Sequence, residues 1–180
     1  NTLDFDGYDG LCAIGGDGTM YEIINGMLKR DDERKVPIGL ITGGTGNSFM
    51  YDVDCLDPIK AAKRIIKHNL RPLDIAKVDA GGELFYSFNI IGWGLATDAG
   101  KLAEKLRWLG GIRYDIASVI EVLKGKDRIA TLTLGKEVIK ENFIFIIGCN
   151  TIHTGKAMKM APLAKLNDGK IDLIIVRKTS

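Results

Sequence analysis

The stretch LCAIGGDGTMYEIINGM, residues 11–27, predicts a strand, a glycine turn and a helix in direct succession. The apolar run LCAIG is short and flanked by glycines, which is typical of a buried strand. Behind the turn GGDGT, apolar side chains recur at the spacing of one helix face: Met20, Ile23, Ile24, Met27 and Leu28. The charged run KRDDERK, residues 29–35, then ends the helix in solvent.

The same succession recurs further along the chain. VPIGLIT, residues 36–42, predicts a second strand, which is also closed by a glycine turn, GGTGNSF, residues 43–49. A helix is expected at about Pro58 to His68, with one apolar face made of Ile59, Ala62, Ile65 and Ile66. Alternating strands and helices predict a parallel α/β layer.

After residue 72 the pattern changes to strands joined by tight turns. PLDIAKVDA (72–80) and ELFYSFNII (83–91) read as a hairpin around Gly81-Gly82, and RIATLTL (128–134) pairs in the same way with EVIKENFIFIIGCN (137–150). A mostly helical stretch, residues 97–124, lies between the hairpins and is broken at Gly110-Gly111, and KIDLIIVRK (170–178) is a last strand. We therefore expect an α/β part, residues 1–72, followed by a β-rich part with inserted helices, residues 73–180.

Composition sets limits on the class of protein. The chain has 180 residues, 46% of them hydrophobic and 27% charged, and its formal net charge of +2 argues against a dedicated nucleic-acid binder. Three widely spaced cysteines, two of them in apolar or mixed runs, predict buried free thiols and a reducing compartment. No segment has the length of a transmembrane helix, and the chain opens without a signal sequence or an initiator methionine, so we expect a piece of a longer protein.

The two glycine turns are the candidates for chemistry. Both follow parallel strands, so both are expected at the same edge of the sheet, where ligands bind in such folds. Glycines let backbone N–H groups point at an anion, and a helix that starts beside them adds its positive end. Asp17 is unusual there, because a carboxylate beside phosphates needs a role such as accepting a proton or binding a metal. The alternative is a plain turn in which Asp17 is a helix N-cap.

These motifs are not a Walker sequence; they resemble the GGDG-type kinases, which include diacylglycerol and sphingolipid kinases, NAD kinases and phosphofructokinases. Later segments favour the lipid kinases among them. WGLATDAGKLAEKLRWLGGIRYD, residues 93–115, is similar to a block of sphingosine and ceramide kinases, and HTGKAMKMAPLAKLNDGKIDLIIVRK, residues 153–178, resembles the late segment of the family. The resemblance covers nearly the whole chain. It implies a nucleotide-binding α/β part followed by an antiparallel, β-sandwich-like, lipid-binding part.

The resemblance also implies roles for individual residues. Asp17 matches the catalytic aspartate that activates the lipid hydroxyl, and Asp98, together with the first turn, matches substrate contacts. The nucleotide contacts fall on Gly15, Gly16, Gly18, Thr19, Glu22, Gly44, Thr45, Gly46, Asn47, Arg107 and Arg113. ATP is therefore the expected cofactor. Mg²⁺ is implied only by ATP chemistry, because no ligand cluster marks a metal site in the sequence.

Several of these residues have simpler interpretations. Arg107 and Arg113 can be surface residues of an amphipathic helix, and Glu22 can be merely solvated. His153 has no evident partner, and a lone histidine is usually structural, so it is not counted among the catalytic residues. Trp93 and Trp108 are expected in the core.

The favoured function is an ATP-dependent kinase for the primary hydroxyl of a sphingosine-like lipid. The acidic pair common in sphingosine kinases is incomplete, since Asp98 is present but the second position is Gly100. Ceramide or diacylglycerol kinase activity, NAD kinase activity and a non-catalytic nucleotide- or lipid-binding module therefore stay open as alternatives. For a lipid kinase without a visible anchor, we expect a cytoplasmic protein with peripheral membrane contact.

Overall fold

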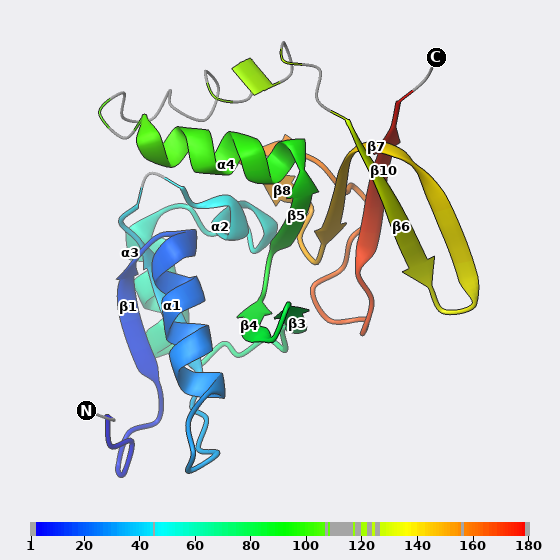
Figure 1. Ribbon diagram of the computed structural model, residues 1–180. Coiled ribbons are helices and arrows are strands. Elements are labelled where there is room, and N and C mark those ends of the chain that lie inside the picture. Colours follow the sequence, from blue (N-terminus) through cyan, green and yellow to red (C-terminus); the bar gives the residue numbers. More distant parts are fainter. Residues whose placement is uncertain are drawn as a thin grey trace. The chain divides into compact units, whose positions relative to one another are not determined.

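The computed structural model describes residues 3–44, 46–106, 108, 117, 120–121, 124, 127–155 and 157–178. The chain forms two compact units (Figure 1). The first comprises Asn1–Ile90 and Cys149–Asp172, and the second Ile91–Gly148 and Leu173–Ser180. Residue 72, where the sequence predicts a boundary, lies inside the first unit, and the assignment of nucleotide and lipid binding to the parts on either side of it stays a prediction.

The first unit begins with the expected alternation of strands and helices. Its elements are β1 (Leu11–Gly15), α1 (Asp17–Leu28), β2 (Ile38–Thr42), α2 (Ser48–Asp52), α3 (Pro58–Ile66), β3 (Ala76–Ala80), β4 (Glu83–Ser87), β8 (His153–Thr154) and β9 (Met158–Lys159). β1 and β2 pair in parallel, from Leu11 with Ile38 to Gly15 with Thr42. The α/β prediction for this part is confirmed.

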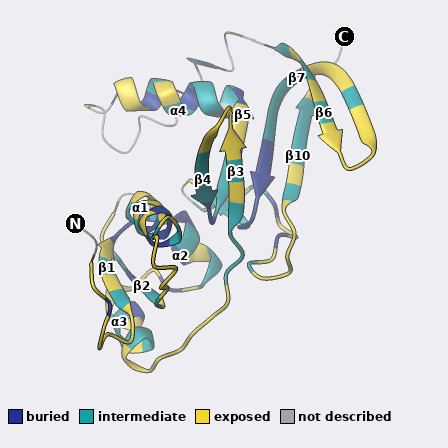
Figure 2. Ribbon diagram, turned by 60° about the horizontal axis from the view of Figure 1, so that its bottom comes forward, coloured by how far each residue is buried: buried dark blue, intermediate teal, exposed yellow. Residues whose placement is uncertain are grey.

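Two helices cover the parallel strands from opposite sides (Figure 2). Gly39 of β2 lies under Ile65 of α3, whose side-chain carbons come within 2.8 Å of where a Cβ on Gly39 would sit. The next residue, Leu40, points to the other face and joins the core with Met20 and Ile24 of α1. The hydrophobic core of the first unit therefore lies between α1, β2 and α3.

Asn25 ties α1 to the hairpin of β3 and β4. Its buried side-chain amide donates to the carbonyl of Tyr86 at 2.8 Å and to that of Tyr21 at 2.9 Å. Its oxygen accepts the Tyr86 N–H at 2.8 Å, so the amide pairs with the edge of β4 as a strand backbone would. This contact holds residues 83–87 to the first unit, beyond the boundary expected at residue 72.

The second unit is mainly a sheet. It contains β5 (Ile90–Gly94), α4 (Leu95–Lys105), β6 (Arg128–Leu134), β7 (Glu137–Cys149) and β10 (Asp172–Arg177). β7 pairs with β10 and β5, and its first half forms an antiparallel hairpin with β6, from Leu134 opposite Glu137 to Arg128 opposite Phe143. The β-rich prediction for this part is confirmed.

Some local predictions differ from the structure. The expected single strand ELFYSFNII is two strands, because β4 pairs with β3 whereas β5 pairs with β7. The bend between them is held by Asn150, whose side chain donates to the Phe88 carbonyl at 2.9 Å and whose N–H donates to the Asn89 carbonyl at 2.8 Å. The short helix α2 has no counterpart in the sequence prediction.

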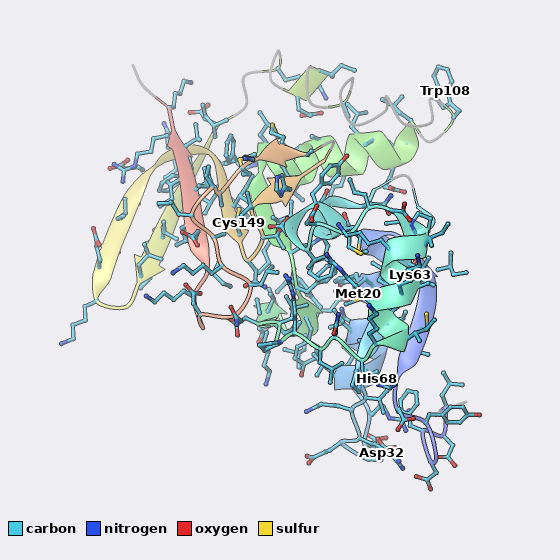
Figure 3. The ribbon with its side chains drawn as sticks, turned by 180° about the vertical axis from the view of Figure 1, so that it is seen from behind. Met20, Asp32, Lys63, His68, Trp108 and Cys149 are labelled. Carbon is cyan, nitrogen blue, oxygen red and sulfur yellow. The ribbon has the colours of Figure 1, made fainter. Side chains whose placement is uncertain are left out.

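The cysteines and tryptophans also depart in part from expectation. All three cysteines are free, and Cys55 and Cys149 are buried, but Cys12 is exposed because α3 packs on β2 and leaves that face of β1 open. Trp93 is 39% exposed and Trp108 is 78% exposed, so neither is a core residue in the described part of the chain. The side chain of Trp108 is labelled in Figure 3. Among the described residues, no helix is both long and apolar enough to cross a bilayer.

Candidate functional site

The two glycine turns meet at one edge of the parallel strands, as the sequence predicts. β1 ends at Gly15 and β2 at Thr42, and the N–H of Gly43 donates to the Gly15 carbonyl at 2.9 Å. The N–H of Asp17 donates to the Gly46 carbonyl, also at 2.9 Å. The turns are therefore joined by backbone hydrogen bonds and form one structure.

The contact between the turns requires glycine. A Cβ on Gly16 would lie 2.3 Å from the carbonyl oxygen of Gly46, and one on Gly44 would lie 2.8 Å from the Cα of Gly16. Both distances are far shorter than non-bonded heavy atoms allow. The glycines at these positions thus let two backbones pack directly against each other.

Gly18 differs from the other glycines of the first turn. A Cβ built on it would meet no atom of the described residues within 4 Å, so it faces open space within this part of the chain. Gly18 and Thr19 are the second and third residues of α1, and their N–H groups donate to no described residue. Free N–H groups at the start of a helix, beside open space, fit an anion such as a phosphate.

Asp17 does not cap its own helix. Gly16 is the N-cap of α1, and the Asp17 carboxylate instead accepts two N–H groups at the start of α2, from Ser48 at 2.8 Å and from Phe49 at 3.1 Å. The Ser48 side chain also hydrogen-bonds to this carboxylate, so three of its roughly four lone-pair sites are used and one is left for another donor. The sequence does not indicate this link, because α2 and its donors lie 31 and 32 residues away.

Burial of Asp17 raises the pKa of its carboxyl group above the usual aspartate value, and the nearby negative charge of Asp52 raises it further. The N–H groups of Phe49 and Ser48 and the side chain of Ser48 oppose this shift without cancelling it. A carboxylate with a raised pKa is a stronger base than an exposed one, which suits a group that accepts a proton.

Asn47 connects the second turn with α2. It is the N-cap residue of α2, and its Nδ2 donates to the Gly44 carbonyl at 2.7 Å. Its Oδ1 is buried and has no hydrogen-bond partner among the described residues. A buried acceptor without a partner is unusual in a folded protein and fits a site that a ligand completes.

The other predicted site residues are not all in this cluster. Glu22 is exposed on α1 and forms no hydrogen bond or ion pair with a described residue. Asp98, on α4 in the second unit, is paired with Arg128, whose Nη2 lies 2.5 Å from its Oδ2. Thr45, Arg107 and Arg113 lie outside the described residues.

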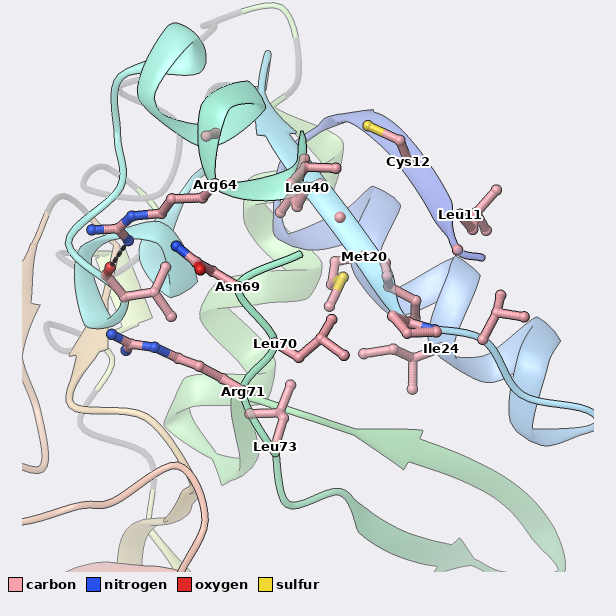
Figure 4. A pocket seen from close by; sticks show the side chains of 18 of the residues that line it. Leu11, Cys12, Met20, Ile24, Leu40, Arg64, Asn69, Leu70, Arg71 and Leu73 are labelled. Carbon is pink, nitrogen blue, oxygen red and sulfur yellow. Dashed lines mark hydrogen bonds between the residues drawn. The ribbon is translucent and has the colours of Figure 1, made fainter. Parts of the chain in front are cut away.

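A cavity of about 1180 Å³ lies within the first unit but away from the turns (Figure 4). Its walls include the core residues Met20, Ile24 and Leu40, whereas Asp17 and the described glycines of both turns are absent from its lining. The cavity is therefore distinct from the space beside the glycine turns.

The residues present fit ATP better than a metal held by the protein alone. The free N–H groups of Gly18 and Thr19 and the open space beside them suit phosphate oxygens. No group of three or more histidine, cysteine, aspartate or glutamate side chains among the described residues could hold a metal ion. A magnesium ion at such a site would take most of its ligands from phosphate oxygens and water.

Comparisons with known proteins find two family models along this chain. Residues 1–78 match the model of the diacylglycerol kinase catalytic domain, and residues 89–180 match that of the YegS C-terminal NAD kinase beta sandwich-like domain. A diacylglycerol kinase from Bacillus subtilis is 32% identical over 185 residues, which cover 96% of this chain and 56% of that protein. Sphingosine kinase 1 of Arabidopsis thaliana is 33% identical over 132 residues, 68% of this chain and 27% of the plant protein.

A solved structure supports the same relationship. The crystal structure of a diacylglycerol kinase from Bacillus anthracis superposes with a TM-score of 0.72 at 26% identity, covering 94% of this chain and 54% of that one. The chain thus spans between 27% and 56% of the length of these relatives. With both family models matched in order along nearly all of its length, the chain belongs to the diacylglycerol kinase catalytic-domain family, and it is also similar to sphingosine kinases.

Proposed function

We propose that the protein is an ATP-dependent lipid kinase that phosphorylates the primary hydroxyl group of a sphingosine-like lipid. The observation that carries the proposal is the pair of glycine turns, packed backbone to backbone, with the half-buried Asp17 carboxylate between the first turn and α2. The similarity to sphingosine and diacylglycerol kinases supports phosphorylation of a lipid as the class of reaction.

In the proposed reaction ATP supplies the phosphoryl group, and Mg²⁺ accompanies it on the phosphates. The N–H groups of Gly18 and Thr19 bind phosphate oxygens at the start of α1. Asp17 accepts the proton of the lipid hydroxyl through a lone pair that Ser48 and Phe49 leave free. The hydrogen bonds from α2 keep the carboxylate oriented during this transfer.

In this proposal the two parts of the chain bind different substrates. The α/β part up to residue 72 binds the nucleotide, and the β-rich part after it holds the lipid chain. Arg107 and Arg113 neutralise charge on the transferred phosphate, because guanidinium groups match phosphoryl oxygens. Since the substrate lies in a bilayer, the protein works in the cytoplasm with peripheral membrane contact.

A diacylglycerol substrate is the second candidate, and one contact favours it. The Asp98 carboxylate, proposed to bind the lipid headgroup, is already paired with Arg128. A positively charged sphingoid amine would have to displace that arginine, whereas the neutral headgroup of diacylglycerol would not. The Bacillus subtilis diacylglycerol kinase is also similar over 96% of this chain.

A transfer assay with labelled ATP tests the proposal. The full-length protein is incubated with sphingosine, ceramide, diacylglycerol or NAD in separate reactions. Phosphorylated sphingosine supports the proposal, and phosphorylated ceramide or diacylglycerol supports the neutral-headgroup alternatives. Activity on NAD alone identifies an NAD kinase, and ATP binding without any transfer identifies a binding module. An Asp17→Asn variant should lose transfer and keep ATP binding, and retained activity would remove Asp17 from the role of base.

A further inference from the structure

The helix that donates to Asp17 is itself anchored at its far end. α2 consists of Ser48–Asp52, roughly 7 Å of helix. Its first N–H groups hold the Asp17 carboxylate, and its last residue, Asp52, carries a side chain that is only 2% exposed. A buried carboxylate needs several donors to offset the loss of water.

Those donors come from a distant segment, residues 152–153. The backbone N–H of Ile152 donates to Asp52 Oδ1 at 2.6 Å, and that of His153 donates to Oδ2 at 3.1 Å. The ring nitrogen Nδ1 of His153 lies 3.0 Å from Oδ2. Because a carboxylate can only accept, the shared proton belongs to Nδ1. The His153 side chain is 14% exposed, and its ring also lies 5.7 Å, centroid to centroid, from that of Tyr51.

The hydrogen bonds to Asp52 matter because its carboxylate lies at an unfavourable end of α2. Asp52 lies at the C-terminal end of α2, where the helix dipole repels a negative charge, and Asp52 also repels Asp17. The imidazole N–H and the two backbone N–H groups offset both effects. Without the imidazole, α2 would lose a side-chain anchor as well as the ring contact at Tyr51.

We infer that Asp52 and His153 form a positioning pair, which holds α2 in place and thereby fixes the carboxylate of Asp17. The pair acts on Asp17 through α2, by its hydrogen bonds and the ring contact of His153 with Tyr51, and has a positioning role. This inference rests on the proposed function for its effect on catalysis, but its structural part, the link from His153 to Asp17, does not depend on any activity.

The test measures Asp17 directly in the full-length protein. The pKa of Asp17 is followed by carboxyl carbon NMR, with the signal assigned through the Asp17→Asn variant, in the wild-type protein and in His153→Ala. Loosening α2 disturbs both the burial that raises the pKa of Asp17 and the hydrogen bonds that lower it, so His153→Ala should shift this pKa away from its wild-type value. In the kinase assay the same variant should reduce kcat about tenfold and leave KM for ATP unchanged, a loss of about 1.4 kcal/mol in transition-state stabilisation.

Two further variants test the inference even if His153→Ala does not fold. His153→Asn places an amide N–H where Nδ1 lies and should preserve both the pKa of Asp17 and kcat. His153→Gln places its amide near the other ring nitrogen and should behave like the alanine variant. The second histidine, His68, is exposed, and His68→Asn serves as the matched control with no effect on Asp17.

The outcomes separate the inference from the proposed function. An unchanged pKa of Asp17 in both His153→Ala and His153→Gln would overturn the positioning role, whatever the activity. A shifted pKa of Asp17 in a protein that phosphorylates none of the lipids would support the link between His153 and Asp17 and refute the lipid kinase proposal instead.

Discussion

Replacing Gly16 with alanine is expected to push the two glycine turns apart and to destabilise the first unit. The new Cβ would lie 2.3 Å from the carbonyl oxygen of Gly46, about 1.2 Å short of the ~3.5 Å at which such atoms rest. The obstacle is backbone, so no side-chain rotation can relieve it. The same movement would stretch the hydrogen bond from the Asp17 N–H to the Gly46 carbonyl.

The magnitude follows from these two effects. Overpacking a well-packed site typically costs about 1–3 kcal/mol. Losing one backbone hydrogen bond adds about 0.5–1.5 kcal/mol. The Gly16→Ala variant should therefore lose about 2–4 kcal/mol in free energy of unfolding, measured by urea unfolding with circular dichroism.

Gly18→Ala is the matched control, two residues along the same motif. Its Cβ would meet no atom within 4 Å among the residues that the structure describes, and the position lies in α1. Alanine there should leave stability unchanged or raise it by up to about 1 kcal/mol. The extra methyl group would, however, occupy the space proposed for phosphate, so KM for ATP should rise. Equal stability of Gly16→Ala and Gly18→Ala would refute the argument that the turns pack backbone to backbone.

Three other predictions concern stability and reactivity. Asn25→Ala should cost about 2–4 kcal/mol in a urea unfolding measurement, because the N–H and carbonyl of Tyr86 lose their partner; a loss below about 1 kcal/mol would contradict the bridging role. The N–H groups of Lys60 and Ile59 lower the pKa of the exposed Asp57 in the folded protein. The Asp57 carboxylate therefore stabilises the fold above its unfolded-state pKa of about 3.9. This stabilisation is lost as the pH falls through the lower pKa of Asp57 in the folded state. Thermal melts of Asp57→Ala should therefore show a weaker pH dependence below about pH 4 than the wild-type protein, and parallel curves would speak against it. Burial raises the pKa of the Cys149 thiol to about 11, whereas Cys12 is exposed. Iodoacetamide at about pH 7.5 should therefore label Cys12 in the native protein and spare Cys149, measured by mass spectrometry of the labelled peptides. Rapid labelling of Cys149 would contradict its burial.

Hydrophobic periodicity and turn-forming residues determine the individual strands and helices of this chain. The strand LCAIG, the helix behind it and the strand that precedes GGTGN occur where the sequence predicts them, because each depends on residues within a few positions of one another. The convergence of both turns at one edge also follows, since parallel strands leave no other arrangement. The amino-acid sequence by itself therefore indicates where the glycine turns and Asp17 come together.

Only the tertiary structure decides which distant groups meet. Asn25 pairs with Tyr86 across 61 residues, and His153 meets Asp52 across 101. The sequence leaves His153 without a partner and Asp17 as either an N-cap or a base, and in the structure Asp17 binds the start of a helix that the sequence does not predict. Five residues carry too little periodicity to reveal such a helix, and it forms because a half-buried carboxylate from another element satisfies its first N–H groups. Hydrogen bonds of this kind depend on packing between segments, which the order of residues along the chain does not display.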